Sequence, residues 1–344
     1  MEAIGRRSRA VIKILAAATG LAVVGVVLDV RIVGQQDATR AKAIAGDIWA
    51  GWSPPRTGYV PKRTADGQPS LEGIYVGAGR QGDDDDEQPE WARRSPDDPG
   101  GTVAGDGSKP TGDGPEFWYE NRYTADGKPV KLNRPHYPSL REPVVYQPWA
   151  QAKVDYIRQH QYKVLSIMDP IVRCFRRGVP RATPGPSYVG IQFLQAAGKV
   201  TIMYEWGHDY RTIWLDRRPH PGKNIKLWMG DSVGRWEGRT LVVDVTNFND
   251  KTWIGGPGSG TFHSDALHVV ERYTPLDPNQ IYYEAWVSDP NVLEKPYRLG
   301  LTLTNTSYIP GYQQFEFACL EGNRAVENIL DGAANLALPP DQRK

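Results

Sequence analysis

The stretch that decides the fold class is residues 234–245, which read GRWEGRTLVVDV. Its two β-prone segments, Gly234–Trp236 and Thr240–Val245, are separated only by the turn at residues 237–239, which contains a glycine. A separation of two or three residues with glycine is typical of a β-hairpin. The stretch therefore predicts two neighbouring antiparallel strands joined by a tight turn.

Similar segments extend on both sides of this hairpin. Residues 201–205 and 283–287 alternate between apolar and polar side chains, the period of a half-buried strand. The expected strands are Leu71–Val76, Tyr188–Gln195, Lys199–Trp206, Arg211–Leu215, Gly234–Trp236, Thr240–Val245, Leu267–Tyr273, Gln280–Val287, Tyr297–Asn305 and Tyr312–Cys319. Short strands with tight turns and no long helices between them predict a mainly β fold, either an antiparallel β-barrel or a sandwich.

Helical periodicity is confined to the flanks of this β-rich region. Residues 147–167 have apolar side chains near helical spacing, and Asp169-Pro170 ends the pattern. Residues 323–336 predict a C-terminal helix that closes the domain, with one apolar face. We expect a helical or irregular arm on the N-terminal side of the strands.

The composition agrees with a turn-rich β protein. The 344 residues include 36 glycines and 28 prolines, too many for a helix bundle or a coiled coil. The formal net charge of +1 gives no electrostatic reason to expect a nucleic-acid partner. The 11 tryptophans and 17 tyrosines far outnumber the 7 phenylalanines. Aromatic side chains with a polar group suit pockets where one edge of the ring stays in contact with water.

The N-terminus has the layout of an export signal. Four basic side chains among residues 6–13 precede an apolar run, Ile14–Leu28. A secretory signal peptide and an uncleaved signal-anchor share this order, so residues 1–40 are expected to be one or the other. Either would carry the rest of the chain to the far side of the membrane. The expected location is periplasmic or extracellular, with membrane contact only through the N-terminal segment if that segment is not cleaved.

The composition changes twice after this signal. Residues 41–76 form a proline- and glycine-rich arm that ends in the first expected strand. Residues 77–115 contain an acidic run at 83–87 followed by proline, glycine, aspartate and serine. Such a segment has too little apolar surface to fold, which predicts a disordered acidic insertion. Residues 116–344 are expected to form the β-rich domain with its closing helix.

The chain has two cysteines, Cys174 and Cys319. In an exported chain, an even number of cysteines predicts one disulfide between them. Neither cysteine has a cysteine or histidine at zinc-ligand spacing, so a zinc site on them has no support.

Several motifs resemble those of a family of exported bacterial proteins of unknown function. They are Asp169-Pro170 with Cys174, Gly178–Arg181, Trp228–Ser232, Gly234–Gly238 with Thr240–Asp244, and His263–Leu267 with Glu271-Arg272. The likeness covers about residues 165–335 and the segment from Asp66-Gly67 to Tyr75, and the insertion at 77–115 looks longer than is typical of the family. The order of the strands also resembles lipocalin-like barrels, a likeness of fold that implies no function by itself.

Polar and aromatic side chains concentrate between residues 204 and 272, at the ends of the expected strands. In a barrel such ends line one rim, where ligands bind. One hypothesis makes His263 a general base that is oriented by Asp265 or, across the rim, by Asp231. The alternative is that residues 263–265 cap a turn and bind backbone groups.

A second hypothesis pairs Asp231 with Glu237 as two carboxylates acting on a glycosidic bond, with tryptophans stacked on the sugar. Its alternative places Trp236 in the core and Glu237 in solvent. The expected ligand-binding side chains are Trp236, Arg211, Arg235, His208, Asp216 and Glu271. The two arginines among them suit a ligand carboxylate or phosphate, or alternatively an ion pair with a neighbouring carboxylate.

A third hypothesis gives His208, His220 and His263 to a metal ion, although no histidine spacing supports a ligand set, and the metal remains unknown. We expect no cofactor, because no phosphate-binding loop or dinucleotide fingerprint follows a strand.

These observations favour an extracytoplasmic protein that binds an apolar or aromatic small molecule inside a barrel. Acid–base chemistry on that ligand, as in a hydrolase, lyase or isomerase, stays open. One alternative is a carbohydrate-active or carbohydrate-binding protein, and another is a non-catalytic module of the cell envelope that contacts a partner through its aromatic surface.

Overall fold

The computed structural model describes residues 57–77, 140–183, 190–255, 259–306 and 313–337. All of them belong to one compact unit, residues 55–344. The expected signal segment at 1–40, the arm up to residue 56 and the acidic insertion apart from Gly77 lie outside the described residues. In the described part of the chain, no helix is both long and apolar enough to cross a bilayer.

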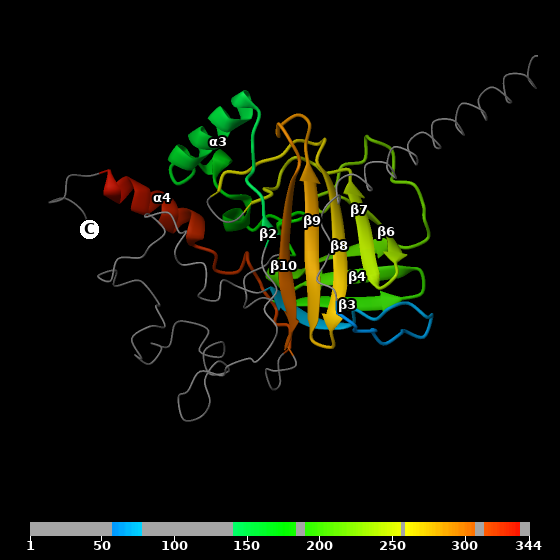
Figure 1. Ribbon diagram of the computed structural model, residues 1–344. Coiled ribbons are helices and arrows are strands. Elements are labelled where there is room, and N and C mark those ends of the chain that lie inside the picture. The colour runs from blue at the N-terminus through cyan, green and yellow to red at the C-terminus, as the bar shows by residue number, and fades with distance from the viewer. Residues whose placement is uncertain (1–56, 78–139, 184–189, 256–258, 307–312, 338–344) are drawn as a thin grey trace, which may run out of the picture. The chain divides into compact units, whose positions relative to one another are not determined.

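The described chain is mainly β, as the sequence predicts (Figure 1). Its strands are β1 (Gly73–Gly77), β2 (Leu140–Arg141), β3 (Ile191–Ala196), β4 (Lys199–Tyr204), β5 (Asp209–Trp214), β6 (Asp231–Glu237), β7 (Thr240–Thr246), β8 (His268–Asp277), β9 (Gln280–Ser288) and β10 (Tyr297–Asn305). The helices are α3 (Pro148–His160) and α4 (Ala325–Leu336), with short 3₁₀ turns at Leu165–Ile167, Pro170–Arg173 and Trp206–His208.

Nine of these strands close into a barrel. The order β1-β3-β4-β5-β6-β7-β8-β9-β10 is completed by pairing of β10 with β1, and the short β2 pairs with β10 from outside this circuit. Eight of the neighbouring pairs in the circuit are antiparallel, whereas β5 and β6 are parallel. Of the two architectures that the sequence predicts, the structure has the barrel.

The parallel pair has a direct consequence for the chain between β5 and β6. Parallel neighbours need a crossover connection, because the chain must return to the end where the first strand began. Residues 215–230 make this return as an irregular segment, which we call the crossover. The two strands share only the partners Ile213 with Ser232 and Trp214 with Val233. A Cβ atom at Gly234 would lie 2.5 Å from Ile213, so this glycine lets β5 approach β6 closely.

Side chains fill the interior of the barrel. Alternate residues of β7, β8 and β9 point inward and belong to one buried cluster, as expected for strands with a period of two. Tyr273, Tyr283 and Phe193 are among the largest fully buried side chains. The ring of Tyr273 lies 5.3 Å from that of Phe193 and 5.1 Å from that of Tyr283, in the tilted and edge-on geometries that aromatic pairs prefer.

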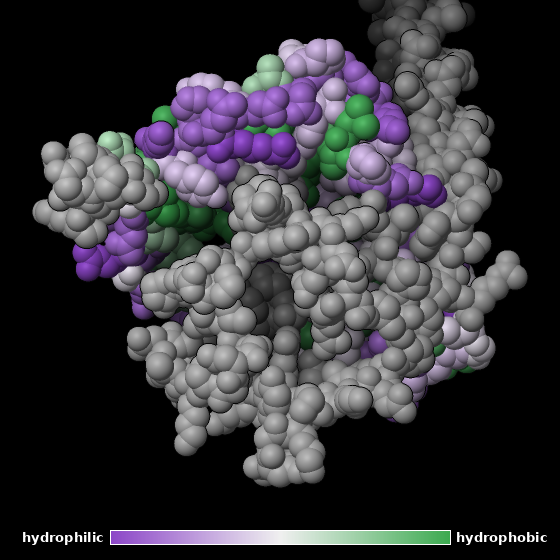
Figure 2. Space-filling model, turned by 60° about the vertical axis from the view of Figure 1, so that its left-hand side comes forward, coloured by the Kyte–Doolittle hydropathy of each residue, from purple (hydrophilic) through white to green (hydrophobic). Residues whose placement is uncertain are grey.

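Both helices lie on the same side of the molecule, beyond β10 in Figure 1. The disulfide between Cys174 and Cys319, which the sequence predicts, joins the turn before β3 to the segment before α4. The Asn323 side chain donates to the carbonyl of Val172 at 3.0 Å and so ties the start of α4 to the same turn. Figure 2 shows hydrophilic side chains gathered over the upper part of this side, where α3 lies.

Two predicted elements differ from the structure. The helix expected over 147–167 ends at His160, and the residues after it form a 3₁₀ turn that stops before Asp169-Pro170. The strand expected over 312–319 is wrong for the described residues 313–319, which have no strand pairing. The ring of Phe317 in that segment stacks on Trp206 at 4.3 Å, so its aromatic residues contact the barrel without joining the sheet.

Candidate functional site

An open groove of about 540 Å³ lies where β5 and β6 separate. It is lined by Arg176, Tyr210, Arg211, Thr212, Trp214, Lys226, Leu227, Trp228, Met229, Gly230, Asp231 and Ser232. One wall is therefore β5, and the other is the end of the crossover together with the first residues of β6. The parallel pairing creates this site, because β5 pairs with β6 only at Ile213 and Trp214. Residues 209–212 of β5 therefore have no partner on β6, and the end of the crossover lies beside them.

The groove combines a buried polar base with an exposed aromatic rim. Arg211 and Ser232 are almost inaccessible to solvent, whereas the side chain of Tyr210 is 62% exposed and that of Trp214 is 37% exposed. Trp228 packs against Phe175 at 5.3 Å between ring centres. A concave surface of aromatic side chains with a few buried polar groups is typical of small-molecule sites.

Behind the base of the groove lies a network inside the barrel, which we call the inner network. Its members are Thr183, Tyr204, Arg211, Ser232, Glu271, Tyr273 and Tyr283. Arg211 Nη1 lies 2.6 Å from Glu271 Oε2, and Arg211 also donates to the hydroxyls of Tyr204 at 2.9 Å and Tyr273 at 2.7 Å. Tyr273 and Tyr283 in turn donate to Glu271 Oε1 at 3.0 and 2.9 Å.

The pairing of Arg211 with Glu271 controls the ionisation of the inner network. Burial by itself lowers the pKa of Arg211, but the carboxylate of Glu271 outweighs it and holds the pKa well above its usual range. Burial raises the pKa of Tyr273 and of Tyr283 well above 10. Arg211 therefore keeps its charge and both tyrosines stay neutral at physiological pH.

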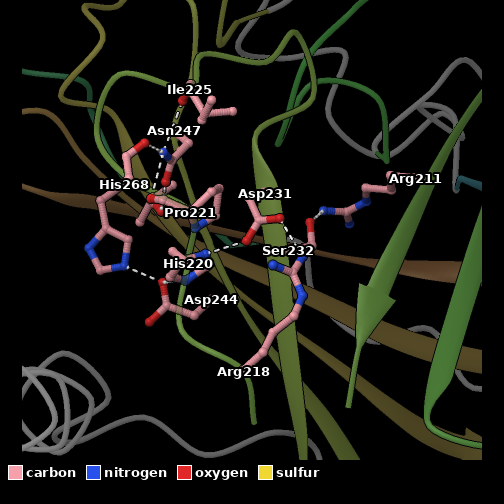
Figure 3. Close-up of polar contacts among 12 residues, drawn as sticks. Arg211, Arg218, His220, Pro221, Ile225, Asp231, Ser232, Asp244, Asn247 and His268 are labelled. Atoms are coloured by element: carbon pink, nitrogen blue, oxygen red, sulfur yellow. Dashed lines mark hydrogen bonds and ion pairs between the residues drawn. The ribbon is translucent and has the colours of Figure 1, made fainter. Parts of the chain in front are cut away.

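A second chain of polar contacts, the outer network, lies on the opposite face of β6 (Figure 3). It consists of Arg218 and His220 from the crossover, Asp231 from β6, Asp244 from β7 and His268 from β8. Asp231 accepts from Arg218 at 2.5 Å and from Nδ1 of His220 at 2.7 Å. Asp244 Oδ1 lies 2.8 Å from Nε2 of His268 and 3.6 Å from Nε2 of His220.

The outer network favours a protonated His220. Burial lowers the pKa of His220, but the carboxylates of Asp244 and Asp231 outweigh burial and raise it above its usual value. Burial by itself raises the pKa of Asp244, but the contacts with His220 and His268 outweigh burial and hold this pKa well below its usual range. The carboxylates and the imidazolium thus stabilise one another.

Asn247 fixes the crossover on its other side. Its backbone has a left-handed φ of 64°, and its side-chain amide donates to the carbonyls of Pro221, Gly222 and Ile225 at 2.9 to 3.2 Å. The fixed carbonyls hold residues 221–225 against the end of β7. This anchor sets the position from which Lys226 and Trp228 reach the groove.

The structure does not bring His263 and Asp265 together as a proton-transfer pair. His263 is buried, its Nε2 lies 2.7 Å from the Thr252 hydroxyl and its Nδ1 lies 2.8 Å from the Ser264 carbonyl. Because that carbonyl can only accept, Nδ1 donates and Nε2 accepts, and burial lowers the pKa of this histidine. Asp265 lies at the surface with Lys226, 2.9 Å away.

The expected carboxylate pair is also separated. Asp231 lies in the outer network, whereas Glu237, at the other end of β6, contacts Arg235 at 2.6 Å and Arg272 at 3.0 Å. The two arginines outweigh the effect of burial and lower the pKa of Glu237. Trp236 is partly buried against the core, as one of the alternatives has it.

The remaining expected ligand residues are scattered. Arg211 and Glu271 meet inside the barrel, as the ion-pair alternative expects for Arg211. Asp216 caps the crossover by accepting from the backbone of Arg218 at 3.2 Å. His208 accepts from the backbone N–H of Phe317 at 3.1 Å. His220 and His263 contact other residues, so the three histidines share no partner. Among the described residues, no three or more His, Cys, Asp or Glu side chains converge as a metal site would require.

The sequence reasoning missed the partners that make the outer network. Asp244 and His268 were not candidates, and His220 was considered only as a metal ligand. The strand period carried a usable signal, because Asp244 alternates with the inward-facing Val243 and Val245 and so points outward, toward the same face as Asp231. Comparisons of the chain with protein-family models, curated proteins and solved structures find no match.

Proposed function

We propose that this chain is an exported protein whose groove binds a small molecule with a flat ring and an anionic group. The observation that carries the proposal is the lining of the groove, where Tyr210, Trp214 and Trp228 lie beside the cations Arg176 and Lys226. The Cys174–Cys319 disulfide and the expected N-terminal signal support an oxidising, extracytoplasmic location.

The aromatic rim would hold the ring of the ligand. Trp214 and Tyr210 belong to the same face of β5, and both remain exposed although they line a concave site. Leu227, 39% exposed, adds an apolar contact from the crossover. Covering these side chains removes apolar area from water, a contribution of about 25 cal/mol per Å².

The cations of the groove would hold the anionic group. Arg176 is half exposed and uses Nε for its contact with Asp209 at 3.1 Å, and an arginine has four further N–H donors on its terminal nitrogens. Lys226 forms a surface ion pair with Asp265, which water and salt weaken. A ligand carboxylate or phosphate can therefore compete for both side chains.

The polar groups beside the groove support binding rather than proton transfer. Asp231 accepts from both Arg218 and His220, and both nitrogens of His220 face carboxylates. A general base needs a free lone pair within reach of the substrate. A protonated His220 has no free ring lone pair, and Asp231 accepts from two protein donors, so these groups set the charge of the site.

Isothermal titration calorimetry on the full chain, kept oxidised, tests the proposal with a matched pair of ligands. We expect 2-naphthoate to bind at least about tenfold more tightly than its neutral isostere 2-naphthamide, because charge-assisted hydrogen bonds are the stronger ones. Inorganic phosphate, which has no ring, should bind more weakly than 2-naphthoate.

Two pairs of variants localise the binding. Lys226→Ala should weaken 2-naphthoate, whereas Lys223→Ala, an exposed change in the same crossover that does not line the groove, should not. Trp228→Ala should weaken it as well, whereas Trp149→Ala on α3 should not. Equal affinity for naphthoate and naphthamide, or equal effects of variants and controls, would overturn the proposal.

A neutral oligosaccharide and its uronic-acid counterpart form a further arm of the titration. The exposed Tyr210 and Trp214 also suit a sugar face, which keeps a carbohydrate ligand as the second candidate. Binding of the neutral oligosaccharide with no preference for the acidic one would favour that candidate over a small anion.

A further inference from the structure

We propose that anion binding in the groove is coupled to the protonation of His220, so that the ligand is held while His220 is protonated and released as His220 loses its proton. This inference concerns the regulation of the same groove and rests on the proposed function. His220 does not line the groove; it acts through Asp231, which does.

The geometry around His220 favours two protons on its ring, because each ring nitrogen faces a carboxylate. Nδ1 lies 2.7 Å from Asp231 Oδ2, and Nε2 faces Asp244 Oδ1 at 3.6 Å. A neutral imidazole has one N–H and one lone pair, so one nitrogen would then direct its lone pair at a carboxylate. Loss of the proton therefore disrupts at least one of the two contacts. The two carboxylates raise the pKa of His220 above its ordinary value, so this event lies at a higher pH than for a free histidine.

Charged groups surround His220 from every element that contacts it. Asp231 comes from β6, Asp244 comes from β7, and His268 from β8 reaches His220 only through Asp244. Arg218 lies two residues away on the crossover and binds the other oxygen of Asp231. With His220 neutral, two carboxylates remain beside it, and Asp231 keeps a single cationic partner.

A short path connects this change to the ligand. Asp231 lines the groove, and its partner Arg218 lies with its guanidinium 5.3 Å above the ring of Trp214, which also lines the groove. A less neutralised Asp231 repels an anion in the groove. A release of Arg218 would also change the cation that covers one face of Trp214. Both effects lower the affinity as pH rises.

Thermodynamic linkage makes the coupling reciprocal. If the protonated protein binds an anion more tightly, the bound anion must raise the pKa of His220 by the corresponding amount. The chain would then take up protons when it binds and release them when the ligand leaves. A protein with these properties collects its ligand where the pH is low and delivers it where the pH is higher.

The experiment measures the affinity for 2-naphthoate, which keeps its charge throughout, between about pH 6.5 and pH 9. We expect the dissociation constant of the unmodified chain to rise about fivefold over this range, at the lower end of typical coupling between sites. In His220→Gln the dissociation constant should stay constant. His160→Gln, a change at a half-exposed histidine on α3, should behave like the unmodified chain.

Two further groups are controlled in the same experiment. Burial raises the pKa of Asp209, the partner of Arg176, to about 6, so a start at pH 6.5 leaves only the upper part of its titration in the measured range. Asp231→Asn provides a second variant, which removes the carboxylate charge that lines the groove. We expect the pH dependence to fall in this variant too.

An NMR titration of His220, first without ligand and then with 2-naphthoate, separates the possible failures. The His220 ring signal, assigned by NMR through His220→Gln, should titrate above the ordinary histidine value and shift upward with 2-naphthoate. Binding that is independent of pH, or a pH dependence that His220→Gln retains, would overturn this inference and leave the proposed function standing. Absence of binding at every pH would overturn both, even if the NMR titration is as expected.

Discussion

The inner and outer networks occupy opposite faces of β6, through the neighbouring residues Ser232 and Asp231. Arg211 and Glu271 of the inner network have lost nearly all contact with water, and three tyrosine hydroxyls form hydrogen bonds with the pair. In the outer network, Asp244, His220 and His268 each keep about a quarter of the side chain exposed.

This difference in exposure separates two roles for charged residues. A fully buried ion pair is stable only while both partners are present, because an uncompensated charge in the interior is strongly destabilising. A partly exposed pair contributes little to stability, and its protons can exchange with solvent. The inner network thus contributes to the uniqueness of the fold, and the outer network is the one able to respond to conditions.

The largest expected effect is that of Glu271→Leu in the inner network. The change leaves the Arg211 charge buried without a carboxylate and removes the acceptor of two tyrosine hydroxyls. We expect the free energy of unfolding to fall by about 3–5 kcal/mol, measured by urea denaturation. The double variant Arg211→Met/Glu271→Leu should recover much of that loss. Equal instability of the single and double variants would show that lost packing, not the unpaired charge, is responsible.

The next effect concerns Glu284, which points outward on β9 and yet is fully buried between its partners Arg272 on β8 and Gly300 on β10. Arg298 lies two residues before Gly300 on β10. Burial outweighs the two arginines and raises the pKa of Glu284 to about 8. A raised folded-state pKa gives stability that is present below the unfolded-state value and is lost as pH rises through about 8. The loss of stability is at most about 1.4 kcal/mol for each pH unit between the unfolded-state pKa and the folded-state pKa.

Glu284→Gln should therefore become more stable than the unmodified chain as pH rises from about 6 to 9, as measured by urea denaturation at each pH. Glu237→Gln is the matched control, because the pKa of Glu237 is lowered and its contribution is lost only as pH falls. A constant difference between Glu284→Gln and the unmodified chain across this range would show that Glu284 is not buried as described.

A smaller effect is expected for Asp244→Asn in the outer network. The lowered pKa of Asp244 gives stability that is lost as pH falls through that pKa, and the raised pKa of His220 gives stability that is lost as pH rises. The variant should cost on the order of 1 kcal/mol near pH 5–6 and less on either side. Thermal unfolding across pH measures this profile; a loss as large as that of Glu271→Leu would remove the distinction between the networks.

The smallest effect is expected at the exposed end of β6. Arg235 and Glu237 form an ion pair with both side chains more than two-fifths exposed. Arg235→Ala should change the free energy of unfolding by less than about 0.5 kcal/mol, and added salt should abolish the difference. A loss above 1 kcal/mol in urea denaturation would show that exposure does not decide the contribution of these pairs.

Most of the fold could be predicted from local patterns. The hairpin of β6 and β7 and the pairing of β8 with β9 follow from alternation and short turns, which act between residues close in sequence. The disulfide followed from the number of cysteines in a chain with an expected export signal. Each of these inferences needs only information contained in one segment or in a count.

The site could be predicted only in part, because it depends on long-range geometry. Asp231, Arg211 and Glu271 were identified as important polar residues, and Glu271 was among the ion-pair partners considered for Arg211. The partners of Asp231, Arg218 and His220, were not identified. The parallel pairing of β5 with β6 gives no local signal, and that pairing places His220 beside Asp231. Asp244 and His268 meet across two strands, so that only the register between β7 and β8 brings them together.

The position of the groove follows from the parity of the barrel. In a closed circuit each antiparallel neighbour reverses the direction of the chain, and a return to the first strand requires an even number of reversals. Nine strands therefore cannot close with antiparallel pairs alone, and this barrel meets the requirement with one parallel seam, between β5 and β6. The odd strand number obliges the barrel to have such a seam, and the groove lies at this seam.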